Sequence, residues 1–182
     1  LFDIYLSKVS AQRNFLTFAV YSTMFPYTSA GPIVRYTDIE TQLKQRTINI
    51  SKFGIGAELF VKGLAKKVLL ADNLSVLYSS ICGHPQMSVF TSWLGILAYT
   101  MQLYFDFSGY SDMAIGLGKM LGFDFNKNFD YPYISTSVSE FWRRWHISLG
   151  SWFRDYIYIP LGGNRVSTLK HIRNILVVWA LT

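Results

Sequence analysis

The sequence has almost no cysteine and unusually little charge. Its single cysteine, Cys82, excludes an internal disulfide and a metal site built from several cysteines. Charged residues make up 15% of the chain, well below the share of about a quarter that is usual in soluble domains. Hydrophobic residues account for 51% and aromatic residues for 17%. This balance indicates a membrane protein.

Lysine and arginine are absent from the middle of the chain. None occurs from Val68 to Gly118, while nine lie at or before Lys67 and eight at or after Lys119. The net charge of +6 favours contact with anionic membrane lipid or an anionic substrate. Nucleic acid is not expected as a partner, because the aromatic residues lie in apolar runs and not among the basic residues.

Two apolar runs, 56–81 and 88–104, fill the interval without basic residues. The break between them at 82–85, Cys-Gly-His-Pro, is typical of a turn. The positive-inside rule therefore predicts a hairpin of two membrane helices, with its turn outside and its basic flanks in the cytoplasm. A buried helical pair in a soluble protein is the alternative.

The remaining segments are predicted to be irregular or interfacial. Segment 15–34 is apolar but contains Pro26 and Pro32, which favours a broken helix or a re-entrant segment. Segment 35–52 is polar and is expected to form an interfacial loop or an amphipathic helix. Segment 122–173 is too charged to cross lipid and too aromatic for a free loop, so we expect interfacial and re-entrant structure.

Together these segments predict an all-α fold, a polytopic membrane helical bundle with broken, re-entrant and interfacial helices. Residues 1–182 are expected to form one partial membrane domain. The chain begins without a methionine and stops inside the apolar run 174–182, which is shorter than the roughly 20 residues of a helical span. We therefore expect the bundle to be incomplete at both ends.

The segment Ser139–Arg165, SEFWRRWHISLGSWFRDYIYIPLGGNR, surrounds His146 with tryptophan, phenylalanine and arginine. A helix is expected to begin near Ser137 or Ser139, either of which can cap it. Glu140 and Arg144, four residues apart, favour an ion pair on this helix. An apolar face with helical spacing is predicted from Trp142, Trp145, His146, Leu149 and Phe153. His146 is thereby predicted to point into an aromatic wall.

A histidine in such a wall can accept a proton, because its ordinary pKa of about 6.5 is close to neutral pH. The alternative is a neutral core histidine bonded to a carbonyl group. A histidine base suits acyl transfer to a hydroxyl, which is a poor nucleophile until its proton is removed. No Ser-His-Asp order or GxSxG motif occurs, so an acyl-serine route has no support.

Arginines near His146 are candidates for binding phosphates of a donor or headgroups of lipid, and interfacial anchoring is the alternative for each of them. A second candidate is Asp106, which ends an apolar run between two phenylalanines. A carboxylate at that depth suggests function, with Arg143 or His146 as its partner, unless it simply meets water at a helix end. Glycines in segment 116–122 favour close helix packing.

Three segments occur in an order that resembles the membrane-bound O-acyltransferase family. They are FPYTSAGPIVRY (25–36), LYFDFSGYSDMAIGLGKMLGF (103–123) and FWRRWHISLGSWFRDYIYIPLGGNR (141–165). The resemblance covers nearly the whole chain and is greatest to the branch that O-acetylates alginate and related exopolysaccharides. The D-alanyl transfer protein of teichoic acids is a close relative of that branch.

The resemblance implies a multi-helix bundle around a tunnel in the bacterial cytoplasmic membrane. An acyl donor such as acetyl-CoA or an acyl-carrier thioester would arrive from the cytoplasm as a co-substrate, with no bound cofactor and no metal. The acceptor would be a hydroxyl of an envelope polysaccharide outside, reached with periplasmic or extracellular partner proteins. D-alanyl transfer to teichoic acid, or a non-catalytic transporter or scaffold subunit, are the alternatives.

His146 matches the first of two histidines that the family associates with activity. The second, which the resemblance implies is the catalytic one, lies in a Trp-His-Gly context on the next membrane helix, and we expect this chain, which ends at Val178-Trp-Ala-Leu-Thr182, to stop just before it. Residues 1–182 alone are therefore expected to be inactive. His171 does not match that context and is expected in a juxtamembrane loop, and His84 is expected to be structural. The residues predicted to support His146 or bind substrate are Asp106, Arg143, Arg144, Trp145, Arg154, Asp155, Asn164 and Arg165.

Overall fold

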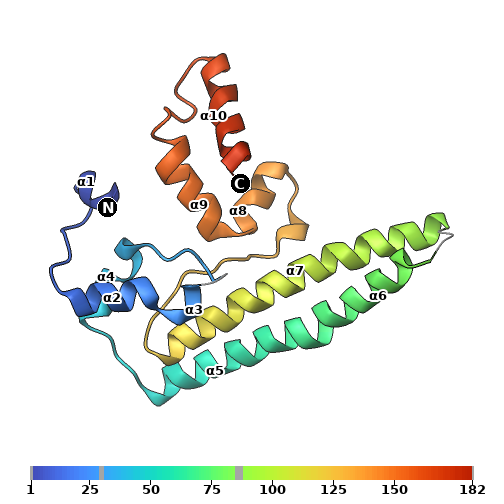
Figure 1. Ribbon diagram of the computed structural model, residues 1–182, viewed down its shortest axis with the longest axis horizontal. Helices are drawn as coiled ribbons and strands as arrows, with labels where there is room; N and C mark the ends of the chain where they lie inside the picture. The colour runs from blue at the N-terminus through green and yellow to red at the C-terminus, as the bar shows by residue number, and fades with distance from the viewer. Residues whose placement is uncertain (1, 29–30, 85–87, 182) are drawn as a thin grey trace. The chain divides into compact units, whose positions relative to one another are not determined.

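The structure is a computed structural model that describes residues 2–28, 31–84 and 88–181. The chain divides into two compact units, Leu1–Asn126 and Lys127–Thr182. Every regular element among the described residues is a helix (Figure 1), so the predicted all-α class is confirmed. The assignment of both units to one membrane domain stays a prediction.

The first unit contains seven α-helices in its described residues and one π-helical segment. Three helix starts are capped by side chains that accept backbone N–H groups, namely Asn14, Asn49 and Ser88. The elements are α1 (Phe2–Tyr5), α2 (Phe15–Thr23), α3 (Phe25–Thr28), α4 (Tyr36–Lys44), α5 (Ile50–Ala65), η1 (Lys66–Ala71, the π-helical segment), α6 (Asp72–Cys82) and α7 (Val89–Met120).

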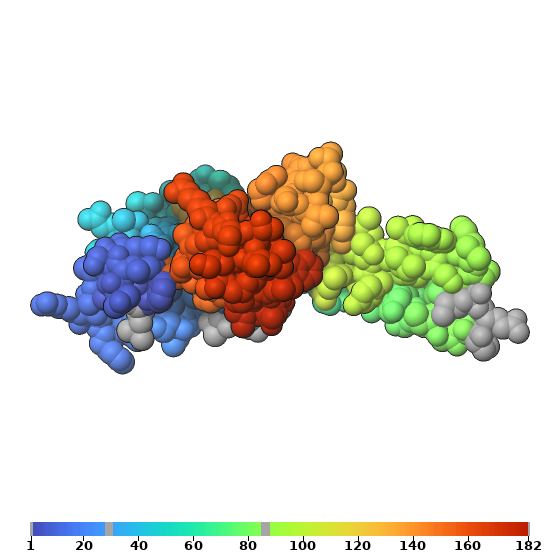
Figure 2. Space-filling model, turned by 90° about the horizontal axis from the view of Figure 1, so that it is seen from above, coloured from blue at the N-terminus to red at the C-terminus, as the bar shows by residue number. Residues whose placement is uncertain are grey.

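The predicted helical hairpin is present. Helices α5 and α6, joined through η1, lie along α7 (Figure 1), and α6 and α7 remain side by side in the space-filling view (Figure 2). Both arms are longer than the apolar runs, because α5 begins at Ile50 and α7 continues to Met120. Pro85 of the predicted turn lies outside the described residues.

Glycines bring the two arms of the hairpin into backbone contact. A Cβ on Gly116 would lie 2.6 Å from the Gly56 carbonyl oxygen, and one on Gly63 would lie 2.5 Å from that of Gly109. Side chains of any size would hold the helices apart at these two crossings. The prediction of close helix packing for the glycines of segment 116–122 is therefore confirmed for Gly116.

Within residues 2–28, 31–84 and 88–181, no helix is both long enough and apolar enough to cross a bilayer. The membrane placement of the hairpin stays a prediction.

Ion pairs also connect the hairpin arms. The Lys66 Nζ lies 2.5 Å from an Asp112 carboxylate oxygen of α7, and the Lys67 Nζ lies 2.7 Å from Asp106 of α7. Lys67 also lies 2.8 Å from Asp72 of its own arm. Both lysines belong to η1, where the wider π-helical turn interrupts the regular helix. Asp106 lies well inside α7, which runs from Val89 to Met120, and not at a helix end. Lys67 is its partner within this unit.

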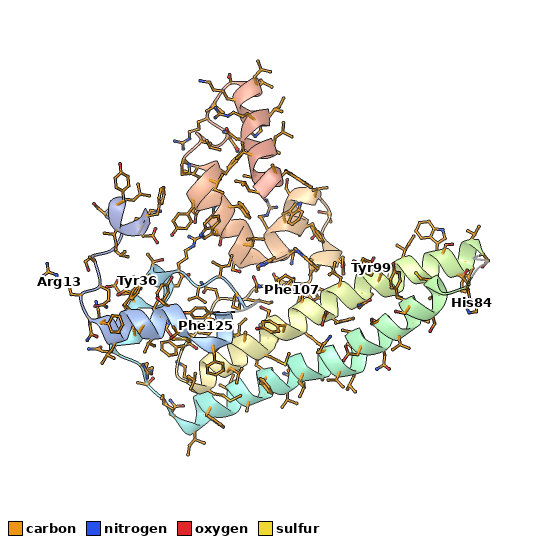
Figure 3. The ribbon with its side chains drawn as sticks, viewed as in Figure 1. Arg13, Tyr36, His84, Tyr99, Phe107 and Phe125 are labelled. Carbon is orange, nitrogen blue, oxygen red and sulfur yellow. The ribbon has the colours of Figure 1, made fainter. Side chains whose placement is uncertain are left out.

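The N-terminal helices pack on a small aromatic core. Met24, Ile39, Phe123 and Phe125 form a buried cluster, of which Phe125 is labelled in Figure 3. The Tyr27 ring meets Phe125 edge-on at 5.6 Å. Helix α2 ends at Thr23 and α3 begins at Phe25, so the predicted broken helix is confirmed. Of the two alternatives for segment 35–52, the structure has an amphipathic helix, α4, with Ile39 fully buried.

The second unit contains the helices η2 (Pro132–Ile134), α8 (Val138–Arg144), α9 (Ile147–Phe153), η3 (Arg154–Tyr158, π-helical) and α10 (Thr168–Leu181). Ser137 caps α8, because its Oγ accepts the Glu140 N–H at 3.1 Å. The start of this helix and the Glu140–Arg144 pair, with 2.9 Å between Nη2 and Oε1, are confirmed. The single helix predicted through Phe153 is wrong, because α8 ends at Arg144 and α9 begins at Ile147.

Candidate functional site

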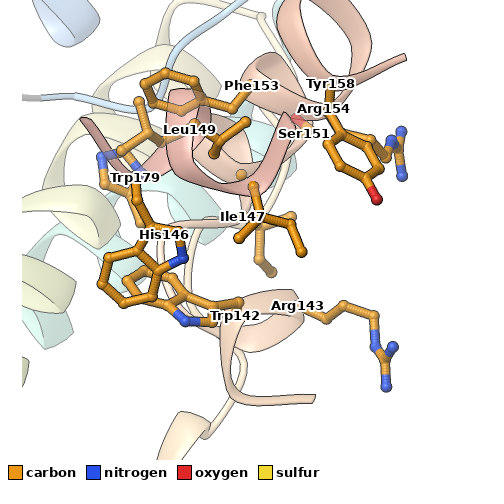
Figure 4. A pocket seen from close by; sticks show the side chains of 13 residues that line it. Trp142, Arg143, His146, Ile147, Leu149, Ser151, Phe153, Arg154, Tyr158 and Trp179 are labelled. Atoms are coloured by element: carbon orange, nitrogen blue, oxygen red, sulfur yellow. The ribbon is translucent and has the colours of Figure 1, made fainter. Parts of the chain in front are cut away.

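A cavity of about 720 Å³ lies within the second unit (Figure 4). Its walls come from α8, α9, η3 and α10, and most of the lining side chains are apolar. The lining residues are Trp142, Arg143, His146, Ile147, Leu149, Gly150, Ser151, Phe153, Arg154, Tyr158, Ile175, Val178 and Trp179. The prediction that His146 faces an aromatic wall is confirmed, with Trp142 and Trp179 in that wall.

His146 lines this cavity from the break between α8 and α9. Its backbone adopts the left-handed conformation, with φ 44° and ψ 56°, which is uncommon for residues other than glycine. The direction of the chain changes there, so α8 and α9 form separate walls. The prediction that Trp142 and Phe153 share the face of one helix is wrong. Both residues and His146 nevertheless line the same cavity.

Asn128 contacts His146 from a segment eighteen positions earlier. The Asn128 Oδ1 lies 3.3 Å from the His146 Nδ1, and it accepts the Ser148 N–H at 3.1 Å and the Ser148 hydroxyl at 2.9 Å. The Asn128 carbonyl oxygen accepts the Ile147 N–H at 2.9 Å. Two N–H groups at the start of α9 are thereby satisfied by a residue that is 1% exposed.

Burial is the main influence on the charge of His146. The side chain is partly buried, and desolvation lowers the pKa of its imidazole below the ordinary value. The neutral form therefore predominates at neutral pH. Since only a neutral imidazole can accept a proton, the environment favours a base over a permanent cation.

Two arginines add positive charge to the cavity. The guanidinium groups of Arg143 and Arg154 lie on one side of the close-up, and the rings of Trp142 and Trp179 lie on the other (Figure 4). The Arg154 Nε donates to Asp155 at 2.7 Å, and its Nη2 does so at 3.3 Å, so part of that charge is compensated. The cavity thus has an apolar side and a cationic side.

A hydrogen-bonded chain continues from the cavity wall at Tyr158. The Tyr158 hydroxyl donates to the Asn164 side-chain oxygen, and the His171 Nε2 lies 2.9 Å from the same hydroxyl. His171 belongs to α10, so its expected place in a loop is wrong. Asn164 lies near the site through Tyr158, although it does not line the cavity.

Other predicted residues serve the fold of this unit and do not line the cavity. The Trp145 ring packs edge-on against Phe129 at 5.1 Å and stacks on Phe141 at 5.7 Å. The Arg144 guanidinium binds Glu140 and, at 3.3 Å, Asp130. These contacts place the Trp145 and Arg144 side chains against other residues of α8 and its preceding segment.

Of the remaining predicted residues, Asp155 pairs with Arg154, and Arg165 is exposed, its N–H donating to the Gly162 carbonyl at 3.1 Å. Asp106 lies in the first unit beside Lys67. Its proposed pairing with Arg143 or His146 stays a prediction. His84 is exposed, and its N–H donates to the Ile81 carbonyl at 3.2 Å.

Sequence reasoning missed three residues of the site, Asn128, Tyr158 and Trp179. Trp179 has a signal in the sequence, because it follows Ile175 and Val178 with the spacing of one helix face. Tyr158 lies inside the histidine-containing segment and was overlooked there. Asn128 has no such signal, since its contacts depend on how distant segments meet.

A family model described as the membrane-bound O-acyltransferase family matches residues 7–181. The chain is 50% identical over 181 residues to a probable alginate O-acetylase of Pseudomonas fluorescens, with 100% of this chain and 37% of that protein covered. It is 40% identical over 174 residues to a peptidoglycan O-acetyltransferase of Helicobacter pylori, with 92% of this chain and 33% of that protein covered.

A teichoic acid D-alanyltransferase of Bacillus subtilis is 34% identical over 147 residues, with 74% of this chain and 35% of that protein covered. The chain therefore spans about a third of the length of each of these three curated relatives.

Proposed function

The chain belongs to the membrane-bound O-acyltransferase family, and on this premise we propose that the protein transfers an acyl group, most simply acetyl, from a thioester to hydroxyls of an envelope polysaccharide. The observation that carries this proposal is a partly buried histidine in a cavity with an apolar and a cationic side. Relatives named as alginate O-acetylase and peptidoglycan O-acetyltransferase support the acetyl group and the polysaccharide acceptor.

In the proposed reaction His146 accepts the proton of the acceptor hydroxyl. The hydroxyl oxygen then forms a bond to the thioester carbonyl carbon, and the carbon–sulfur bond breaks. The proton passes from the imidazole to the departing thiolate, so the products are an ester and a free thiol. No covalent acyl-enzyme is required, in agreement with the absence of a serine nucleophile motif.

The cationic side of the cavity is proposed to hold the donor. Arg143 and Arg154 can bind a phosphate of acetyl-CoA or of an acyl-carrier thioester through charge-assisted hydrogen bonds. The apolar side, including Trp142 and Trp179, would receive the acyl group and exclude water. Exclusion of water would protect the thioester from hydrolysis.

We also propose that the protein is a multi-pass protein of the bacterial cytoplasmic membrane. The support is family membership together with the hairpin, which leaves many large apolar side chains exposed. On α5 and α7 these include Phe53, Ile55, Val61, Leu64, Phe90, Trp93, Ile96 and Leu97. Periplasmic or extracellular proteins would deliver the polysaccharide.

D-alanyl transfer to teichoic acid is the second candidate function. The relative named as a teichoic acid D-alanyltransferase favours it, but its identity to this chain is lower, 34% against 50%. Both reactions move an acyl group from a thioester to a hydroxyl, so the same site would serve either. The acyl group found on the polymer distinguishes them.

The test replaces His146 by alanine in the full-length protein, in cells that make the polysaccharide. We expect ester-linked acetate on the polymer to fall by a factor of about 10² or more, the contribution typical of a general base. His84→Ala is the matched control, because His84 is exposed and lies outside the cavity. Normal acetylation in the His146→Ala protein, at equal protein level, would remove His146 from the mechanism and favour a scaffold role.

A further inference from the structure

We propose that Asn128 is a positioning residue for His146, which holds the imidazole with its proton on Nδ1 and its lone pair on Nε2. The starting observation is the Asn128 Oδ1, which lies 3.3 Å from the His146 Nδ1. The catalytic consequence rests on the proposed function, whereas the hydrogen-bond assignment does not.

The identity of the Asn128 side-chain oxygen follows from Ser148. The Ser148 backbone N–H can only donate, and it points to this atom at 3.1 Å, so the atom is the acceptor oxygen of the amide. The Ser148 hydroxyl donates to the same oxygen at 2.9 Å. This oxygen has no hydrogen to donate, so its 3.3 Å contact with the His146 Nδ1 is favourable only when Nδ1 carries a proton. A lone pair on Nδ1 would be repelled by the oxygen.

Ser148 supports the same assignment from its own hydroxyl. The Ser148 Oγ lies 3.4 Å from the His146 Nδ1, and its hydrogen is already directed to Asn128. This hydroxyl can therefore only accept from Nδ1, which again places the proton there. In a neutral imidazole the proton on Nδ1 leaves the lone pair on Nε2, which is the atom that can act as a base.

Asn128 also fixes the backbone on which the ring is mounted. His146 has φ 44°, and the N–H groups of Ile147 and Ser148 that follow it are bound by the Asn128 carbonyl and side-chain oxygens. The Asn128 Nδ2 is buried without a hydrogen-bond partner among the described residues. A buried amide nitrogen without a hydrogen-bond partner costs free energy, so the Nδ2 does not explain why this position is an asparagine. The hydrogen bonds that the Oδ1 accepts do explain it.

Charged and titratable groups around the cavity also influence the pH at which His146 titrates. Arg143 of α8 and Arg154 of η3 line the cavity with His146, as does Tyr158, which is bonded to His171 of α10. Asp130, next to the Asn128 segment, is paired with Arg144 and a lysine. The variants below leave all of these groups in place, so a change in His146 titration reports on position 128.

The experiment measures ring ¹⁵N chemical shifts of histidine in the full-length protein, with the His146 signals assigned from their loss in His146→Gln. The two neutral tautomers give different shifts at the two ring nitrogens. We expect the Nδ1–H tautomer in the natural protein and a mixture in Asn128→Ala. Asn128→Asp keeps the acceptor and adds negative charge, so it should retain the tautomer and shift the His146 titration to higher pH.

Asn126→Asp is the matched control, since it adds the same charge at an exposed asparagine with no expected contact to His146. An Nε2–H tautomer in the natural protein would overturn the proposal. So would an unchanged tautomer in Asn128→Ala, or a His146 titration that Asn128→Asp and Asn126→Asp move equally. If Asn128→Ala fails to fold, the Asn128→Asp titration still decides.

Turnover separates this inference from the proposed function. We expect Asn128→Ala to lower kcat by about 10²-fold with little change in KM for the donor, because the base is misoriented while the donor site is intact. Acylation that survives His146→Ala would refute the base role but leave the tautomer result standing. A tautomer unaffected by position 128 would refute the positioning role while leaving the base role intact.

Discussion

Replacing Gly63 by alanine should force the hairpin arms apart. The new Cβ would lie 2.5 Å from the Gly109 carbonyl oxygen and 2.8 Å from the Met113 nitrogen, both backbone atoms of α7. Ordinary contact begins at 3.4 Å, so the first distance is short by 3.4 − 2.5 = 0.9 Å. Backbone atoms of a packed helix cannot rotate away as a side chain can, so the two helices must separate.

Two opposing effects set the magnitude. Overpacking of this kind costs about 1–3 kcal/mol. Alanine in place of glycine inside a helix returns about 1 kcal/mol through helix propensity. We therefore expect Gly63→Ala to reduce the free energy of unfolding by up to about 2 kcal/mol. A Cβ added to Gly54, on the same helix, would have no atom within 4 Å, so Gly54→Ala should gain about 0.5–1 kcal/mol.

The assay is thermal unfolding of the full-length protein, followed by circular dichroism. In a protein of 150–250 residues 1 kcal/mol corresponds to about 2–4 °C in Tm, and the shift is smaller in a longer protein. The melting temperature should fall in Gly63→Ala and rise in Gly54→Ala. If both variants shift Tm in the same direction, the helices are not in contact at Gly63 and the reasoning is wrong.

Two further predictions concern pH. Hydrogen bonds from Thr136 and Arg144 lower the pKa of Glu140 to about 2, so the stability that ionised Glu140 contributes is present above the ordinary pKa of 4.5 and is lost as pH falls toward 2. The Tm difference between the natural protein and Glu140→Gln should therefore shrink over that pH range, and a constant difference would contradict the prediction. Burial lowers the pKa of His146, so this imidazole binds a proton more readily in the unfolded chain than in the folded one. The free energy of unfolding should therefore decline as pH falls below about 6.5. Melting curves from about pH 7.5 to about pH 5 should show that His146→Gln lacks this decline.

Local features of the fold were predictable from neighbouring residues. The hairpin followed from two apolar runs around a turn, and the Ser137 cap with the Glu140–Arg144 pair followed from helical spacing. The break near Pro26 was also predicted, because proline disrupts a helix interior. These features depend on contacts within a few positions of each residue.

Features that depend on distant contacts were missed. The segment from Ser137 to Phe153 has good helical spacing, and nothing within it indicates a left-handed residue at His146. That conformation is stabilised by Asn128, whose oxygen atoms bind the N–H groups after the break. The position of Asp106 within α7, paired with Lys67 of η1, likewise depends on the other arm of the hairpin.

By itself the sequence determined the helical class, the family and the histidine at the centre of the site, because composition, residue order and local spacing are properties of the chain alone. Tertiary structure decided which side chains share the cavity. It directed Arg143 and Arg154 there, while Arg144 and Trp145 pack elsewhere. The physical reason is that a cavity wall is formed by segments that meet in space, and the bend at His146 that brings them together is held by hydrogen bonds from outside its own segment.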